Sequence, residues 1–160
     1  MRDQPLFDSQ LNHWQSTDDS WNLKNLSETI ALGGLLQGWI PDLKLLLLKG
    51  PLGAGKTSLV KGFAAKMGVK DEITSPTFAL AQHYTSGYKP LIHIDLYRLS
   101  NKISANELFL QEEEEAHQMQ AVIILEWPER LSLDLKDAYK LNLTYLNPIG
   151  RQARLQRPSE

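Results

Sequence analysis

Runs of apolar residues divide the chain into a few predicted elements. The consecutive leucines 45–48 predict a buried strand, and AVIIL at 121–125 predicts a second one. After the first strand, apolar residues recur at helical spacing and predict an amphipathic helix: Leu59, Val60, Phe63, Ala64 and Met67. Strands that are apolar on both faces, combined with such a helix, are typical of an α/β fold with parallel strands.

A further helix is predicted in front of the leucine strand. Its start is placed at Ser27 and its end at Pro41, and its apolar face would consist of Ile30, Leu35, Leu36 and Trp39. Residues 1–20 lack such a pattern. We therefore expect a polar, poorly ordered N-terminal extension over 1–20, followed by a single domain over 21–160.

The rest of the sheet is predicted from β-rich segments. Residues 77–84 and 91–97 indicate two strands joined by a Ser86-Gly87 turn. Residues 139–146 alternate and turn back into 151–157, which indicates an antiparallel hairpin at the edge of the sheet. We expect a mixed, mostly parallel sheet that is flanked by helices and carries this C-terminal hairpin.

The loop between the leucine strand and its helix carries the clearest chemistry. Residues 50–57, GPLGAGKT, match the phosphate-loop pattern G-x-x-x-x-G-K-[ST]. Lys56 would contact the β- and γ-phosphates, and the Thr57 hydroxyl would bind Mg²⁺. Backbone N–H groups of the glycine turn would surround the phosphates. We predict a P-loop NTPase domain whose nucleotide is lined by Leu52, Gly53, Ala54, Gly55, Lys56, Thr57 and Ser58.

Two acidic residues at strand ends are candidates to complete the site. Asp95 follows LIHI and Glu126 follows VIIL, and ligands bind beyond the carboxyl ends of strands in open α/β sheets. We predict that Glu126 binds Mg²⁺ and that Asp95 positions water or the outer shell of the metal. For Thr77, in the segment TSPT, two interpretations stay open: a γ-phosphate sensor, or a simple entry into the next strand.

Several other polar residues carry a weaker signal. His93 is interpreted as a packed strand residue, and Trp127 as either core or a neighbour of the nucleotide. The acidic run 112–115 favours a solvated helix face or loop over a contact for a basic partner. The hairpin carries three arginines, and we interpret them as charges that protect a sheet edge from pairing rather than as phosphate contacts: Arg151, Arg154 and Arg157.

Composition narrows the function further. The net charge of −2 argues against general nucleic-acid binding, and the absence of cysteine excludes disulfides and thiolate metal sites. No apolar run approaches the ~20 residues of a membrane span, and residues 1–10 do not look like a secretory signal, so we expect a cytoplasmic protein.

Motifs of neighbouring NTPase classes are missing. Asn101-Lys102 is not followed by the aspartate of a guanine-reading N-K-x-D motif, and Arg98 is the only arginine between the phosphate loop and Glu126, too few for a kinase lid. With these classes excluded, we predict a small ATPase that acts on a partner protein.

Four motifs together resemble the TsaE (YjeE) family, the ATPase subunit of bacterial tRNA threonylcarbamoyladenosine (t6A) biosynthesis. They are GPLGAGKT at 50–57, SPTF at 75–78, HIDLYRL at 93–99 and EWPE at 126–129, and the resemblance covers about 25–157. It implies Mg²⁺-dependent ATP hydrolysis coupled to the TsaB–TsaD pair. That pair transfers threonylcarbamoyl to N6 of the adenosine next to the anticodon, in tRNAs that read codons beginning with adenine. This subunit would contact tRNA only indirectly, and no membrane is implied.

The resemblance also implies residue roles. Thr77 corresponds to the switch position, Asp95 to an essential acid and Glu126 to the acid associated with Mg²⁺. Further residues would lie near the nucleotide: Trp127, Glu129, Arg151 and, in the segment that passes the adenine, Ser27. The alternative is a nucleotide-gated docking or regulatory module in which hydrolysis is incidental.

Overall fold

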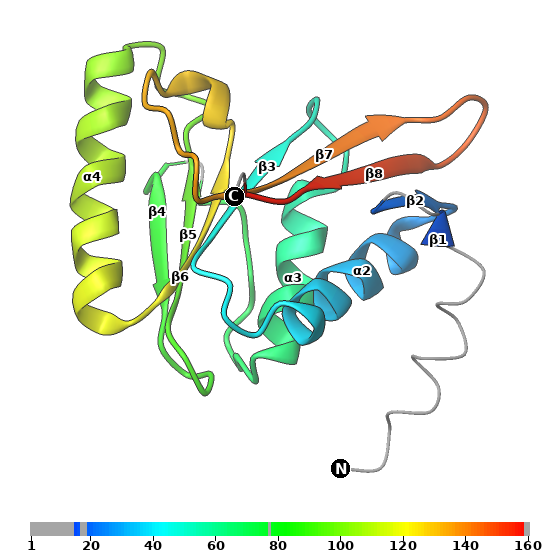
Figure 1. Ribbon diagram of the computed structural model, residues 1–160, viewed down its shortest axis with the longest axis horizontal. Coiled ribbons are helices and arrows are strands. Elements are labelled where there is room, and N and C mark those ends of the chain that lie inside the picture. Colours follow the sequence, from blue (N-terminus) through cyan, green and yellow to red (C-terminus); the bar gives the residue numbers. More distant parts are fainter. Residues whose placement is uncertain (1–14, 17–18, 77, 159–160) are drawn as a thin grey trace.

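The structure is a computed structural model that describes residues 15–16, 19–76 and 78–158 (Figure 1). In chain order, its elements are β1 (Gln15–Ser16), β2 (Ser20–Leu23), α2 (Leu26–Trp39), β3 (Leu45–Lys49), α3 (Lys56–Lys66), β4 (Ala81–Tyr84), β5 (Leu91–Asp95), α4 (Lys102–Met119), β6 (Val122–Glu126), the 3₁₀ helix η1 (Pro128–Arg130), β7 (Tyr139–Tyr145) and β8 (Arg151–Gln156).

The strands form one mixed sheet in the order β1-β2-β8-β7-β3-β6-β5-β4. The four central strands, β7, β3, β6 and β5, run parallel to one another. The remaining pairings, β4 with β5 and β7-β8-β2-β1, are antiparallel. The predicted α/β fold class is therefore confirmed, and the phosphate loop follows a strand in the middle of the parallel part.

Helices cover both faces of the sheet, with α2 and α3 on one face and α4 on the other (Figure 1). Leu46 and Leu48 pack into the core beneath α2 and α3, whereas Leu47 packs into the core beneath α4. Because successive side chains of a strand point to opposite faces, a strand buried on both sides must be apolar at every position. The leucine run of β3 follows from its central place in the sheet.

Helices α2 and α3 approach each other through glycines. A Cβ atom built on Gly62 would lie 1.7 Å from the carbonyl oxygen of Ile30, and one built on Gly33 would lie 2.0 Å from that of Leu59. The two backbones are therefore in direct contact, which only residues without a side chain permit. This crossing fixes the position of α3, whose first turn carries Lys56 and Thr57, the residues predicted to bind phosphate and Mg²⁺.

The predicted apolar face of the α2 segment was partly wrong. Ile30 and Trp39 are 36% and 43% exposed, while the buried positions are Thr29, Leu32, Gly33, Leu36 and Gln37. The physical reason is the glycine contact with α3, which turns Gly33 and its neighbours toward the core. The predicted start at Ser27 was also wrong, because the helix is capped by Asn25, whose Oδ1 accepts a hydrogen bond from the Glu28 N–H at 3.0 Å.

The ends of the sheet differ from the sequence prediction in two places. Strand β8 is not an edge, because β2 pairs with it along its outer side. The strand predicted over 77–84 spans only Ala81–Tyr84, because 78–80 form a turn in which Leu80 has a φ of 64°. Part of the expected extension belongs to the sheet, since Gln15–Ser16 pairs with β2; residues 1–14 and 17–18 lie outside the described part.

The acidic run lies on α4, and one of its members is not solvated. Glu112 is buried and contacts the ring Nε2 of His83 on β4, whereas Glu113 and Glu114 are exposed. The prediction of a solvated face was therefore wrong for Glu112, because the His83 side chain on β4 reaches its carboxylate. Across the described ranges, no helix combines the length and the apolar character needed to cross a membrane.

Candidate functional site

A cavity of about 360 Å³ lies at the carboxyl ends of β3, β5 and β6. Its wall includes most of the predicted phosphate-loop residues: Leu52, Gly53, Gly55, Lys56, Thr57 and Ser58. Ala54 is fully buried within the loop and is not part of the wall. The cavity thus lies at the carboxyl ends of the parallel strands, which is where open α/β sheets bind ligands.

The backbone of the loop explains the glycines of the motif. Gly55, immediately before α3, has a φ of 103°, a left-handed conformation that residues with a Cβ avoid. A Cβ atom on Gly50 would lie 2.6 Å from the carbonyl oxygen of Leu143. Gly55 gives helix α3 no side-chain cap, so with respect to the described residues its first N–H groups remain available to an anion.

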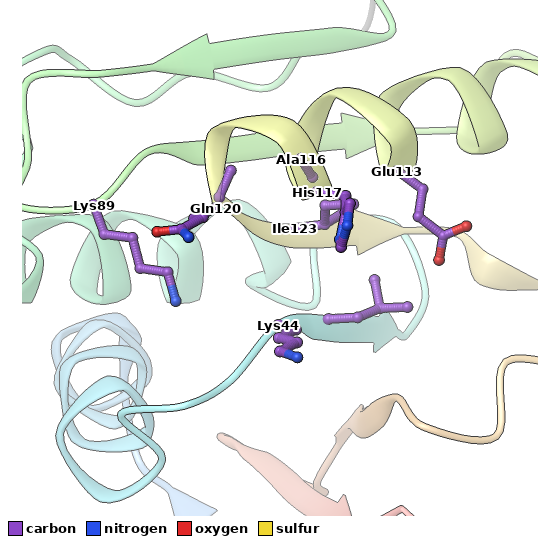
Figure 2. A pocket seen from close by; sticks show the side chains of 9 residues that line it. Lys44, Lys89, Glu113, Ala116, His117, Gln120 and Ile123 are labelled. Atoms are coloured by element: carbon purple, nitrogen blue, oxygen red, sulfur yellow. The ribbon is translucent and has the colours of Figure 1, made fainter.

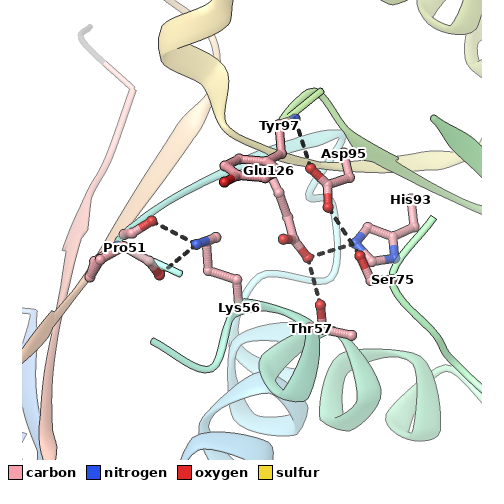
Figure 3. Close-up of polar contacts among 9 residues, drawn as sticks. Pro51, Lys56, Thr57, Ser75, His93, Asp95, Tyr97 and Glu126 are labelled. Atoms are coloured by element: carbon pink, nitrogen blue, oxygen red, sulfur yellow. Dashed lines mark hydrogen bonds and ion pairs between the residues drawn. The ribbon is translucent and has the colours of Figure 1, made fainter. Parts of the chain in front are cut away.

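The side chain of Lys56 is held inside the loop. Its Nζ donates hydrogen bonds to the carbonyl oxygens of Gly50 at 2.6 Å and Pro51 at 2.9 Å (Figure 3). It also lies 4.5 Å from the centre of the Trp127 ring. Burial lowers the pKa of Lys56 below its ordinary value, while the negative charges of Glu126, Asp95 and Glu129 act in the opposite direction.

The two predicted acids lie side by side. The register of β5 and β6 places Asp95 opposite Glu126, and both side chains are buried. Glu126 Oε1 accepts a hydrogen bond from the Thr57 hydroxyl at 3.1 Å (Figure 3). Asp95 accepts one from the Ser75 hydroxyl at 3.1 Å and one from the Tyr97 N–H at 2.9 Å. The structure thus brings Lys56, Thr57, Asp95 and Glu126 to one cavity.

The donor set of this cavity fits Mg²⁺. The Thr57 hydroxyl and the Glu126 carboxylate are already in contact, and the Asp95 carboxylate lines the same wall. All three offer oxygen atoms, which hard divalent cations prefer, and no described sulfur or imidazole nitrogen lines the cavity. The expected cofactor and the residues present are chemically compatible.

Trp127 lies in the wall of the cavity. Its φ of 62° is unusual for a bulky side chain and turns the ring back over the phosphate loop, where it contacts the Tyr97 ring at 4.9 Å between centroids. Of the two sequence interpretations, the structure thus places this ring at the pocket and also against the core beneath α4. Glu129 follows in η1; it does not line the cavity, but its charge acts on Lys56.

Arg151 is brought to the phosphate loop by the C-terminal hairpin. Its Nη2 donates a hydrogen bond to the carbonyl oxygen of Gly53 at 3.0 Å, and the Tyr145 hydroxyl donates one to that of Leu52 at 2.5 Å. Ser27 is exposed and does not line the cavity, whereas its neighbour Leu26 does. Thr77 lies outside the described residues.

Sequence reasoning missed several residues of the site. His93, interpreted as packing only, is fully buried and its Nε2 lies 2.9 Å from Glu126 Oε1. Its position two residues before Asp95 on one strand was a usable signal, because such residues share a face. Ser75 belongs to the segment TSPT, which the sequence marked as a candidate for its hydroxyls, but its bond to Asp95 was not predicted. Tyr145 had no comparable signal, since its contact comes from a segment distant in sequence.

A second cavity, of about 540 Å³, lies at the amino ends of the parallel strands, opposite the first cavity (Figure 2). It is lined by the starts of β3 and β6 and by the last turns of α4, with Lys44, Lys89, Glu113 and His117 around it. It contains none of the predicted site residues that the structure describes. Its mixed charges and its place at the amino ends of the strands make it a weaker candidate than the phosphate-loop cavity.

Comparisons with known proteins point to one family. The family model described as "Threonylcarbamoyl adenosine biosynthesis protein TsaE" matches residues 23–153. Proteins named "tRNA threonylcarbamoyladenosine biosynthesis protein TsaE" are 40% identical in Synechocystis sp. (68% of this chain, 69% of that protein) and 36% identical in Nostoc sp. (83% and 82%). The crystal structure of YdiB from Bacillus subtilis superposes with a TM-score of 0.67 at 26% identity, covering 88% of this chain and 85% of that one.

Proposed function

Because the chain belongs to the TsaE family, we propose that it is a Mg²⁺-dependent ATPase that works in the cytoplasm with the TsaB–TsaD pair to support repeated t6A formation on tRNA. The observation that carries this proposal is the meeting of a phosphate loop with two buried strand-end acids. Thr57 contacts Glu126, and Asp95 lies opposite Glu126 in the sheet. This is the set of groups that phosphoryl transfer to water requires.

In the proposed reaction the loop binds and orients the triphosphate. The N–H groups at the start of α3 and the Lys56 ammonium would hold the β- and γ-phosphate oxygens, with Lys56 leaving the carbonyls of Gly50 and Pro51. Thr57 and Glu126 would hold Mg²⁺, which supplies positive charge to the phosphates. Asp95, which is fixed by Ser75 and Tyr97, would position the attacking water, and Thr77 would sense the γ-phosphate.

Exposed apolar side chains lie on the phosphate loop and on the hairpin that contacts it, which supports the proposed partner. Leu52 in the loop is 59% exposed and Tyr145, which bonds to it, is 55% exposed; Ile149 at the tip of the same hairpin is 79% exposed. Apolar residues grouped on a surface mark protein contact sites. A partner that covers Leu52, which lines the pocket, would also restrict access to the nucleotide and so couple partner binding to ATP turnover.

The proposal is tested by ATP hydrolysis with and without the purified cognate TsaB–TsaD pair. We expect slow turnover alone, stimulation by the pair, and no stimulated turnover in Glu126→Gln and Asp95→Asn. Glu113→Gln, which removes an exposed acid of α4, is the matched control and should behave as wild type. Failure of the pair to stimulate wild-type turnover would contradict the proposal, and GTP hydrolysis in preference to ATP would contradict the assigned nucleotide.

A further inference from the structure

Glu126 is held from two sides inside the site. Its Oε1 accepts a hydrogen bond from the Thr57 hydroxyl at 3.1 Å and lies 2.9 Å from the Nε2 atom of His93 (Figure 3). Thr57 comes from the first turn of α3 and His93 from the neighbouring strand β5. The carboxylate therefore bridges the phosphate loop and the sheet, and both bonds end on the same oxygen.

The hydrogen bond between His93 and Glu126 has a defined direction. A carboxylate oxygen accepts, so the ring must donate from Nε2. The other ring nitrogen, Nδ1, is buried without a hydrogen-bond partner in the described chain, which fits the tautomer that carries no proton there. We assign the proton to Nε2 on this basis.

Packing alone does not account for a histidine at this position. His93 is 0% exposed, and its neighbours on β5, Ile92 and Ile94, are apolar and equally buried. An apolar residue of the same size would fill the space without leaving a buried nitrogen unpaired. The feature that an apolar residue would not supply is the donor to Glu126.

We propose that His93 is a positioning residue for the metal: its Nε2–H fixes the Glu126 carboxylate beside Thr57, so that the two form a ready-made cation site. The proposal rests on the proposed Mg²⁺–nucleotide function. Carboxylate ligands of protein-bound metals are commonly oriented by such outer hydrogen bonds, and loss of one typically costs about 10–100-fold in metal affinity or activity. His93 contacts neither phosphate nor metal in this role.

Metal binding tests the role without relying on turnover. The protein is saturated with the non-hydrolysable ATP analogue AMPPNP, and the affinity of the complex for Mn²⁺ is measured by electron paramagnetic resonance, with Mg²⁺ as competitor. We expect His93→Met, which keeps the volume and removes the donor, to weaken Mn²⁺ binding by about 10–100-fold. AMPPNP affinity in EDTA should stay as in wild type, because the loop and Lys56 are untouched.

Two amide variants separate the donor from the packing. Glutamine reaches the position of the Nε2 atom and can donate to Glu126, whereas asparagine is too short. We expect His93→Gln to restore Mn²⁺ affinity and His93→Asn to fail, a comparison that stands even if His93→Met does not fold. The matched control is His83→Met, on the adjacent strand β4, whose ring contacts Glu112 and not the site.

The outcomes are distinct. Unchanged Mn²⁺ affinity in folded His93→Met or His93→Asn would overturn the positioning role. The role would also be overturned if His93→Gln and His93→Asn lost Mn²⁺ affinity equally and in proportion to their loss of melting temperature. A wild-type protein that binds neither AMPPNP nor Mn²⁺ would instead refute the proposed function on which the role rests.

Discussion

Substitution of Gly62 by alanine tests the arrangement that holds α3 in place. The new Cβ would lie 1.7 Å from the carbonyl oxygen and 2.6 Å from the carbonyl carbon of Ile30. Ordinary van der Waals contact for a Cβ begins near 3.4 Å, so the two helices would have to separate locally by about 1.7 Å. Both opposing atoms belong to the backbone, and no rotamer change can relieve the clash.

The expected cost is the difference between two opposing effects. Overpacking of a core costs about 1–3 kcal/mol, and a clash between backbones belongs at the upper end of that range. Alanine in place of glycine inside a helix stabilises the folded state by up to about 1 kcal/mol. We therefore expect a net loss of about 2 kcal/mol, which for a domain of this length lowers the melting temperature by about 4–8 °C.

The assay is urea and thermal unfolding followed by circular dichroism. Gly38→Ala is the matched control, because this residue lies in α2 and its Cβ would meet only the flexible Lys66 side chain at 3.7 Å. That variant should gain up to about 1 kcal/mol from helix propensity. If Gly62→Ala were as stable as Gly38→Ala, the close crossing of α2 and α3 would be refuted.

The remaining predictions concern the cap of α2, the lysine and the arginine of the site. Asn25→Ala should destabilise the protein by about 1 kcal/mol in urea unfolding, and Ser27→Ala should have almost no effect; the reverse order would contradict the observed cap. Asp95→Asn removes a charge that raises the pKa of Lys56, so its pKa should fall further below 10.5. Phosphates bind the charged ammonium, so ATP affinity measured in EDTA should fall as the pH rises and Lys56 loses its proton. In the Asp95→Asn variant this fall should begin at a lower pH than in wild type. Identical pH profiles of ATP affinity would refute the coupling between Asp95 and Lys56. Arg151→Ala, which frees the Gly53 carbonyl, should weaken ATP binding without a comparable loss of thermal stability, and unchanged binding would exclude a role for the hairpin in shaping the loop.

The phosphate loop and the central strands could be predicted because their signals are local. The leucines of β3, the glycine turn and the apolar spacing of α3 all lie within 45–67. Asp95 and Glu126 could be paired because each ends an apolar strand, and parallel strands bring such ends together. In the structure they occupy opposite positions of one register.

Features that depend on distant segments could not be predicted in the same way. β8 becomes an internal strand only because β2, from the start of the chain, pairs with it. The buried face of α2 is set by a glycine contact, and a count of apolar residues does not register glycine. The contact of Glu112 with His83 depends on how far side chains reach between neighbouring elements. For His93, the strand face that it shares with Asp95 was a signal for the site, but not for the specific bond to Glu126.

The central claim is that ATP hydrolysis at this site supports repeated tRNA modification. The most direct measurement is multiple-turnover t6A formation by the cognate TsaB–TsaD pair with wild-type protein or with Glu126→Gln, after ATP binding by the variant has been verified. We predict many rounds of modification with wild type and no more than about one round with the variant, because the site binds ATP but cannot turn it over. Equal repeated modification by both proteins would contradict the claim and favour a docking module whose hydrolysis is incidental.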